Sequence, residues 1–146
     1  MIEFTVAPSH SYCAATNCDV PSIAIADTSG HALAQTSSCT DVSCVTCESS
    51  ACPGYACITQ FIDITGGTLN WDGSYITGSS CGSAVSCVET VYAKPGKYVA
   101  SMCASPGHAS APDAGPQHCV STGPADCAQV TFDFPSSTVA RAVIGG

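Results

Sequence analysis

Cysteine is the residue that most constrains this chain, because twelve of its 146 residues are cysteines. A share of about 8% is typical of small domains held together by disulfide bonds, and such bonds persist outside the cytosol. The number is even, so every cysteine can pair. We therefore expect a secreted or cell-surface protein in which all twelve form disulfides: Cys13, Cys18, Cys39, Cys44, Cys47, Cys52, Cys57, Cys81, Cys87, Cys103, Cys119 and Cys127.

The connectivity of these bridges does not follow from the sequence, although loop-closure entropy favours bridges between cysteines that are close along the chain. On that ground the predicted local pairs are Cys13–Cys18 and Cys81–Cys87. Cys103 is expected to join the late part of the chain through Cys119 or Cys127.

The chain carries few charges and most of them are acidic, with three Lys or Arg against eleven Asp or Glu and a net charge of -8. An acidic surface repels the phosphate backbone, so nucleic acid is not an expected partner. No apolar run reaches the roughly 18 residues of a membrane span. Residues 1–4 lack the basic and apolar regions of a signal peptide. Because the cysteines indicate an exported protein, we expect that a signal peptide has been removed. Neither Asn17 nor Asn70 begins an Asn-x-Ser/Thr acceptor, which favours a bacterial origin.

Apolar residues alternate with polar or small ones in short segments separated by Pro and Gly, which predicts strands rather than helices. Predicted strands cover residues 2–6 (an edge strand), 23–25, 31–36, 56–65, 68–71, 84–93, 97–104 and 130–134. Turns are expected at residues 27–30, at Gly66-Gly67 as a hairpin, at 72–73 and at 95–96, and loops over 36–54 and 105–125. The sequence predicts one all-β domain over residues 1–146, with 136–146 as a short strand or a linker.

One predicted strand ends in Trp71-Asp72-Gly73, and Pro95-Gly96-Lys97-Tyr98 later leads into a strand that ends at Ala104. Through these two motifs, residues 68–104 resemble bacterial Ig-like β-sandwich domains. The similar families are the Ig-like domain of the flagellar hook-capping protein and the Bacillus intracellular proteinase inhibitor family. The cysteine-rich pattern also resembles secreted proteins of myxobacterial type. The interval between the two motifs is longer in this chain than in the usual pattern of these domains, and residues 79–87 fill it. The resemblance implies an antiparallel, disulfide-rich Ig-like sandwich and no catalytic residue.

Some cysteine spacings also match metal or redox motifs. Cys39, Cys44 and Cys47 have the spacing of a plant-type ferredoxin loop, with Cys81 as a fourth ligand for an iron–sulfur cluster. Cys44 and Cys47 also form a C-x-x-C pair, but no helix is predicted after it to lower a thiol pKa. The remaining cysteines serve neither purpose, so structural disulfides are the preferred interpretation and no cofactor is expected.

Two further patterns are weaker. Residues 78–82 satisfy G-x-S-x-G, yet the following segment alternates like a strand, whereas a nucleophile elbow needs a helix there. His108, His118 and Cys119, with Asp113 between them, could hold zinc or copper, but their spacing is no known ligand signature. We expect them, like His10 and His31, to be loop residues without a metal, and we expect no catalytic residue.

Side-chain alternation gives two predictions for the core. Tyr98, Ala100 and Met102 share one strand face, which the resemblance places inward. Trp71 is the only tryptophan, and we expect it in the core with Ile62 and Ile64 across the Gly66-Gly67 turn, rather than as a sugar-stacking platform beside Asp72 and Tyr75.

The predicted function is a non-enzymatic extracellular binding or structural module with a protein or carbohydrate partner. The alternatives are a secreted proteinase inhibitor, a carbohydrate-binding module and, more remotely, a metal or iron–sulfur protein.

Overall fold

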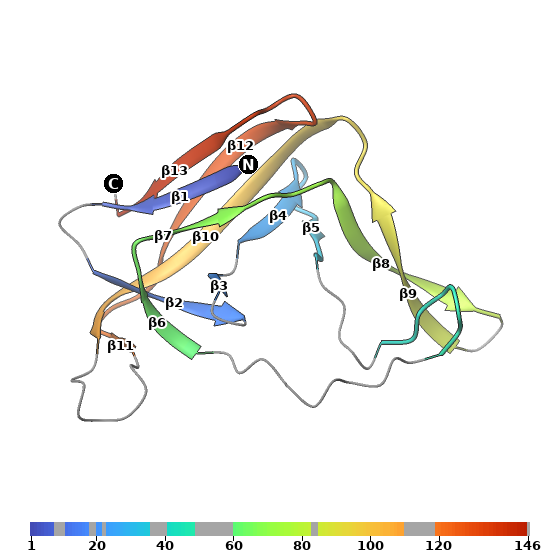
Figure 1. Cartoon of the computed structure of the whole chain (residues 1–146), viewed down its shortest axis with the longest axis horizontal. Coiled ribbons are helices and arrows are strands. Elements are labelled where there is room, and N and C mark those ends of the chain that lie inside the picture. Colours follow the sequence, from blue (N-terminus) through green and yellow to red (C-terminus); the bar gives the residue numbers. More distant parts are fainter. Residues whose placement is uncertain are drawn as a thin grey trace.

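The computed structural model describes residues 1–7, 11–17, 20–21, 23–35, 41–48, 60–82, 85–109 and 119–145, and this part of the chain is built from strands (Figure 1). The strands are β1 (Ile2–Val6), β2 (Tyr12–Asn17), β3 (Val20–Pro21), β4 (Ala24–Asp27), β5 (Ala32–Leu33), β6 (Gln60–Ile64), β7 (Gly66–Leu69), β8 (Ser74–Cys81), β9 (Val85–Tyr92), β10 (Gly96–Ala109), β11 (Cys119–Ser121), β12 (Asp126–Phe134) and β13 (Ala140–Ile144). The all-β prediction is confirmed for these residues. None of them belongs to a helix that could cross a membrane.

Strand β10 organises the larger sheet, which contains β2 to β6 and β10 to β12. Its first nine residues pair with β12, and part of the same stretch pairs with β4 on the other side. Its last five residues pair with β2 and β11. In Figure 1 this long strand runs diagonally across the molecule and links the two ends of the sheet.

The predicted strand over residues 97–104 is therefore confirmed. The predicted loop over 105–125 is wrong at its start, where β10 continues to Ala109, and at residues 119–121, which form β11. Pro106 and Gly107 suggested a loop. Gly107 instead serves close packing, because a Cβ at this position would collide with Cys13 Sγ and with the carbonyl of Val120. A glycine in a strand interior often marks such an approach.

A second sheet has the order β13-β1-β7. Strand β1 was expected at a sheet edge, but it is central, with a parallel partner in β13 and an antiparallel partner in β7. Residues 136–146 were predicted to be either a short strand or a linker, and the structure confirms a strand, β13, within them. The parallel β1–β13 pair departs from the purely antiparallel prediction.

The Gly66-Gly67 hairpin prediction is wrong. Both glycines belong to β7 and lie opposite Thr5 and Phe4 of β1, while β6 pairs with β2. The chain changes sheets at this point instead of folding back on itself. Gly66 is required by close approach, because a Cβ there would collide with the carbonyl of Phe4.

The two sheets share one core. Ile2, Phe4 and Ile144 from the β13-β1-β7 sheet belong to the same buried cluster as Met102 and Phe132 from the larger sheet. On β10, Ala100 and Met102 are 0% and 1% exposed, whereas Cys103 on the opposite face is exposed. The predicted inward face of this strand is confirmed. The more specific Ig-like arrangement stays a prediction.

Strands β8 and β9 form a separate two-stranded hairpin, which projects from the rest of the molecule in Figure 1. Strand β9 matches the segment predicted over residues 84–93, but β8 was not predicted. An antiparallel bridge ties the hairpin to the sheet near β5, where Ile76 N–H donates to the carbonyl of Ala34 at 2.6 Å.

Candidate functional site

The far end of the β8–β9 hairpin is covered by residues 41–48, and we call this loop together with the adjoining end of the hairpin the tip. The loop runs along the edge of β9. Val88 N–H donates to the carbonyl of Val42 at 2.8 Å, and Cys44 N–H donates to the carbonyl of Val88 at 3.0 Å. These bonds fix the loop to the hairpin through its backbone.

The loop then closes into a tight turn around Ser43. Cys47 N–H donates to the carbonyl of Ser43 at 2.7 Å, and Val45 N–H donates to Ser43 Oγ at 3.2 Å. The backbone of Cys47 has a positive φ of 57°, which residues other than glycine rarely adopt. Residues 43–47 are thus held in a turn and not in an extended conformation.

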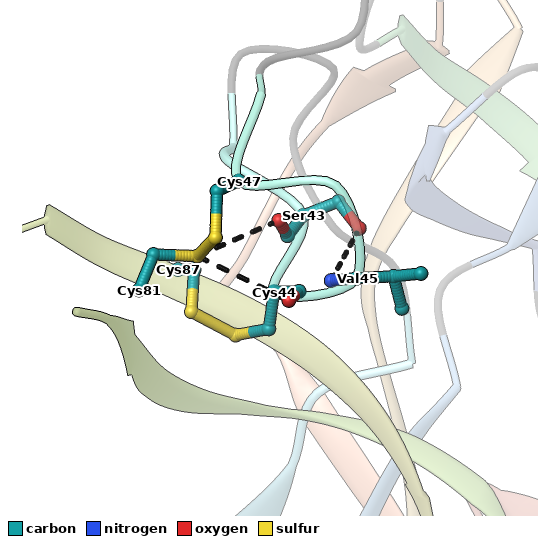
Figure 2. The surroundings of a disulfide bond; sticks show 6 residues. All are labelled: Ser43, Cys44, Val45, Cys47, Cys81 and Cys87. Carbon is teal, nitrogen blue, oxygen red and sulfur yellow. Dashed lines mark hydrogen bonds between the residues drawn. A yellow bond between two sulfur atoms is a disulfide. The ribbon is translucent and has the colours of Figure 1, made fainter.

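Two disulfides join this turn to the hairpin, as Figure 2 shows. Cys44 is bonded to Cys87 and Cys47 to Cys81, with Cα–Cα distances of 5.0 and 5.7 Å. The predicted Cys81–Cys87 bridge is therefore wrong. The loop over residues 36–54 was expected to be cross-linked, and in its described part it is cross-linked to another element.

The other two described bridges lie beside β10. Cys103 is bonded to Cys127, directly opposite on β12, with a Cα–Cα distance of 4.1 Å, and this confirms one of the two predicted partners. Cys13 is bonded to Cys119, 106 residues away, so the predicted Cys13–Cys18 bridge is wrong. Loop entropy favoured the local pair, but β10 brings β2 and β11 together around Gly107.

No described cysteine is free: Cys13, Cys44, Cys47, Cys81, Cys87, Cys103, Cys119 and Cys127 are all disulfide-bonded. Cys18, Cys39, Cys52 and Cys57 lie outside the described residues, so their predicted oxidation stays a prediction.

Val45 is the most exposed large apolar residue of the described chain. It is 91% exposed, whereas Cys87, which is bonded to the neighbouring Cys44, is 3% exposed. Val85, at the start of β9, is 47% exposed and lies opposite Cys81 in the hairpin register, on the face that carries the loop. The tip thus presents apolar side chains on a backbone fixed by hydrogen bonds and disulfides.

The loop and the hairpin also carry exposed acidic residues. Glu48 ends the described loop and Glu89 follows Val88 on β9, and both are exposed. The chain has three basic side chains, and none of them belongs to the loop or the hairpin. Two of these, Lys97 and Arg141, form ion pairs with Asp133 and Glu3 elsewhere.

The structure brings together three residues of the ferredoxin-type hypothesis, Cys44, Cys47 and Cys81, but as disulfide-bonded residues; Cys39 lies outside the described residues. The G-x-S-x-G segment lies in β8 and continues through Gly82 into β9. The strand–turn–helix geometry of a nucleophile elbow is therefore not formed around Ser80.

The histidine hypothesis finds little support. His108 is exposed on β10 and lies opposite Val120 of β11. Cys119, which lies opposite Ala109, is bonded to Cys13 and cannot act as a thiolate. His31 is exposed beside the turn that follows β4. His10, Asp113 and His118 lie outside the described residues, and within those described no three metal-binding side chains form a group.

A second candidate site is a cavity of about 230 Å³ beside Trp71. Trp71 is partly buried and packs against Tyr98, Phe132 and Phe134, with ring centroids 5.0 to 5.8 Å apart. Of the predicted partners, Ile64 belongs to the buried cluster against which Trp71 packs, and the side chain of Ile62 lies outside the described residues. The indole Nε1–H donates to the carbonyl of Ser74 at 2.8 Å. The core prediction for Trp71 is thus confirmed in its packing, while one part of the ring lines a cavity.

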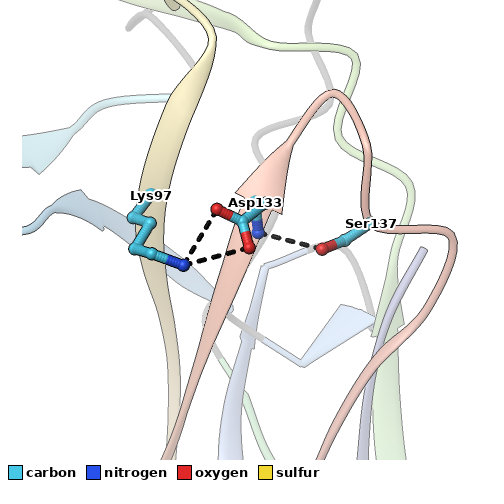
Figure 3. A network of polar contacts seen from close by, with 3 residues as sticks. All are labelled: Lys97, Asp133 and Ser137. Carbon is cyan, nitrogen blue, oxygen red and sulfur yellow. Dashed lines mark hydrogen bonds and ion pairs between the residues drawn. The ribbon is translucent and has the colours of Figure 1, made fainter.

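Asp133 and Ser137 line the polar side of this cavity. Lys97 Nζ contacts both carboxylate oxygens of Asp133 at 3.0 and 3.1 Å, and Asp133 N–H donates to Ser137 Oγ at 2.9 Å (Figure 3). The Lys97 and Asp133 side chains are 63% and 51% exposed, so water screens their attraction. The ion pair therefore contributes little to stability, and of its two members Asp133 lines the cavity.

Sequence reasoning missed Val45. The available signal was an apolar residue inside a C-x-x-C segment whose neighbours are otherwise polar. Comparison of the chain with protein-family models, with curated proteins and with solved structures finds no match in any of the three.

Proposed function

We propose that this chain is a non-enzymatic extracellular binding module whose contact surface is the tip around Val45. The single observation that carries the proposal is the 91% exposure of Val45 on a turn held by two disulfides. A valine gains about 1.5 kcal/mol or more when it is buried. An apolar side chain held in water on a fixed backbone is therefore suited to insertion into a partner.

The rigidity of the loop at residues 41–48 favours binding as much as the exposure of Val45 does. Ordering a loop costs free energy on binding, and a loop that is already ordered avoids most of that cost. Thr46 in the loop and Val85 at the end of the hairpin are also exposed, so the tip offers more than a single side chain. The tip thus resembles an interface anchor surrounded by polar residues.

The turn geometry favours this mode over proteinase inhibition. A peptide that lies in a protease cleft as an added strand must be extended. The Cys47-to-Ser43 hydrogen bond closes residues 43–47 into a turn instead. We infer that the tip inserts as a compact projection, and a protease panel tests the inhibitor alternative.

A carbohydrate-binding module is the second candidate, favoured by the cavity beside Trp71. The cavity combines an aromatic wall with the carboxylate of Asp133 and the hydroxyl of Ser137. Aromatic stacking with a few placed polar groups is what a small polar ligand needs. The three rings that pack against Trp71 leave less of its surface for stacking, which makes this the weaker candidate.

Two further parts of the proposal concern context. The eight disulfide-bonded cysteines support export to an oxidising compartment. The shared core of the two sheets supports the Ig-like assignment made from residues 68–104.

The test compares binding by the wild type, Val45→Asp and Val143→Asp. Val143 is 51% exposed on β13, away from the tip, and serves as the matched control. Each protein is immobilised and exposed to purified surface and secreted proteins of the producing organism, to extracellular proteases and to a glycan array. We expect saturable binding of a protein by the wild type and the control, weakened at least tenfold by Val45→Asp. Equal binding by all three, or binding of glycans alone, would contradict the proposal.

A further inference from the structure

The tip gathers four sulfur atoms from two separate segments. Cys81 and Cys87 point to the same face of the hairpin, because their register places Cys87 opposite Ser79, two residues from Cys81. Cys44 and Cys47 come from the turn that lies over this face. Cys81 Sγ lies 3.8 Å from the carbonyl oxygen of Ser43 and 4.0 Å from that of Cys44, so the two disulfides are neighbours (Figure 2).

We propose that these four cysteines bind one Zn²⁺ as a tetrathiolate site when both disulfides are reduced. In the disulfide-bonded state no such site exists among the described residues, because a sulfur in a disulfide is not a thiolate. Each disulfide accepts two electrons and two protons from one dithiol reductant, which becomes a disulfide itself. Zinc then displaces the protons of the four thiols as the thiolates bind.

The geometry suits a tetrahedral ion. Zinc–sulfur bonds of about 2.3 Å place the sulfurs of a tetrahedron about 3.8 Å apart. A disulfide holds its sulfurs about 2.0 Å apart, so each pair has to open by less than about 2 Å. The exposed Cys47 can supply this movement in its pair with Cys81. In the other pair, the partly buried Cys44 can move while Cys87 stays buried.

The spacing of the four cysteines along the chain also favours a zinc site. Structural zinc sites commonly take two ligands from a short C-x-x-C turn and two from a second segment. Here the first pair is Cys44 and Cys47, and the second is Cys81 and Cys87 of the hairpin. The Cys103–Cys127 bridge lacks such a second pair of cysteines. It joins β10 to β12 as a single pair, and no other described cysteine pairs with either strand at that point.

Zinc and the disulfides are alternative ways to connect the same loop to the same hairpin. Zinc would therefore keep the tip folded under reducing conditions that break the disulfides. This inference does not depend on the proposed binding function, since the wild type can bind a partner through Val45 whether or not its reduced form binds zinc.

The test uses the full chain, reduced with a phosphine and refolded with and without Zn²⁺. Bound zinc is counted after desalting, and cysteines are alkylated and mapped by peptide mass spectrometry. We expect one zinc per chain and protection of Cys44, Cys47, Cys81 and Cys87 from alkylation. Cobalt in place of zinc should give the visible absorption of a tetrahedral thiolate complex.

The matched variants are Cys44→Ser with Cys47→Ser, which should lose the zinc, and Cys103→Ser with Cys127→Ser, which should retain it. Absence of stoichiometric zinc from the wild type would overturn the inference. So would protection of cysteines other than these four, or full zinc binding by the Cys44/Cys47 variant. The alkylation map of the wild type decides the matter even if a variant does not fold.

Discussion

Cys81 and Cys87 lie diagonally across the β8–β9 hairpin, because Cys81 pairs with Val85 and Cys87 pairs with Ser79. Diagonal neighbours on one sheet face are about 7–8 Å apart, which is too far for a disulfide without movement of the backbone. Both cysteines therefore remain available to a third segment, and the turn at residues 44–47 provides their partners.

The first prediction concerns the disulfide map. All twelve cysteines should be oxidised, so titration of the unreduced, unfolded protein should find essentially no free thiol. Proteolysis without reduction should release peptides that link Cys44 to Cys87 and Cys47 to Cys81. More than two free thiols per chain, or a peptide that links Cys81 to Cys87, would contradict this map.

The second prediction tests the inward face of β10. Met102 is 1% exposed and belongs to the core shared by both sheets. Met102→Asp buries a charge without a partner and should destabilise the fold by more than about 4 kcal/mol, enough to prevent folding. Ser101→Asp, on the opposite and partly exposed face, is the control and should remain folded by circular dichroism. A folded Met102→Asp protein would reverse the assignment of the two faces.

Local patterns in the sequence predicted several strands and the turns after β4 and before β8 correctly. The segments at residues 2–6 and 130–134 alternate clearly, and both lie within strands with one face in the core. The turn after β4 could also be predicted from local sequence, because aspartate favours Asx turns. Asp27 Oδ1 accepts hydrogen bonds from the N–H groups of Ser29 and His31. These features depend on neighbours along the chain, so the sequence contains them.

The sequence did not allow us to predict which strands pair with each other or which cysteines form disulfides. Strand β1 pairs with β13 at the other end of the chain, and Cys13 pairs with Cys119 across 106 residues. Alternation specifies which side of a strand is apolar but not which strand lies beside it. Strand β8 was missed for a different reason: six of its eight residues are Ser, Thr, Gly or Tyr, and no residue of this strand is fully buried, so no apolar periodicity marks it.

The third prediction compares two glycines with positive φ. Gly73 has a φ of 90°, and a Cβ there would collide with the ring of Phe134, next to Trp71. Gly30 has a φ of 85°, but a Cβ there would meet nothing within 4 Å. Gly30→Ala should therefore cost only backbone strain of about 1 kcal/mol. Gly73→Ala should cost about 2 kcal/mol more in urea unfolding, since the aromatic cluster must shift. Equal destabilisation would exclude the clash.

The fourth prediction is a pH dependence. Hydrogen bonds from the Ser29 hydroxyl and the His31 N–H lower the pKa of Asp27 below its ordinary value of 3.8. The Ser74 hydroxyl and N–H lower the pKa of Asp72 in the same way. A carboxyl group with a lower pKa in the folded state stabilises the fold above the unfolded pKa, and this contribution is lost as pH falls through the folded pKa.

The test measures the urea midpoint of the wild type and of Asp27→Asn with Asp72→Asn from pH 7 to pH 2. The difference between the two proteins should be constant above about pH 5 and should shrink below pH 3.8. A difference that does not change with pH would show that the two carboxylates contribute nothing through their charge.

The fifth prediction distinguishes the two candidate sites through Trp71, the single tryptophan of the chain. Because its ring packs against three aromatic residues and its Nε1–H is bonded to Ser74, its emission should be blue-shifted and only weakly quenched by acrylamide. Trp71→Ala should lower the free energy of unfolding by about 2–3 kcal/mol, less than the loss for a fully buried tryptophan. Val45→Asp should leave both properties unchanged. If acrylamide instead quenches Trp71 strongly, and added oligosaccharide prevents this quenching, the cavity beside Trp71 is the binding site and the proposal for the tip is wrong.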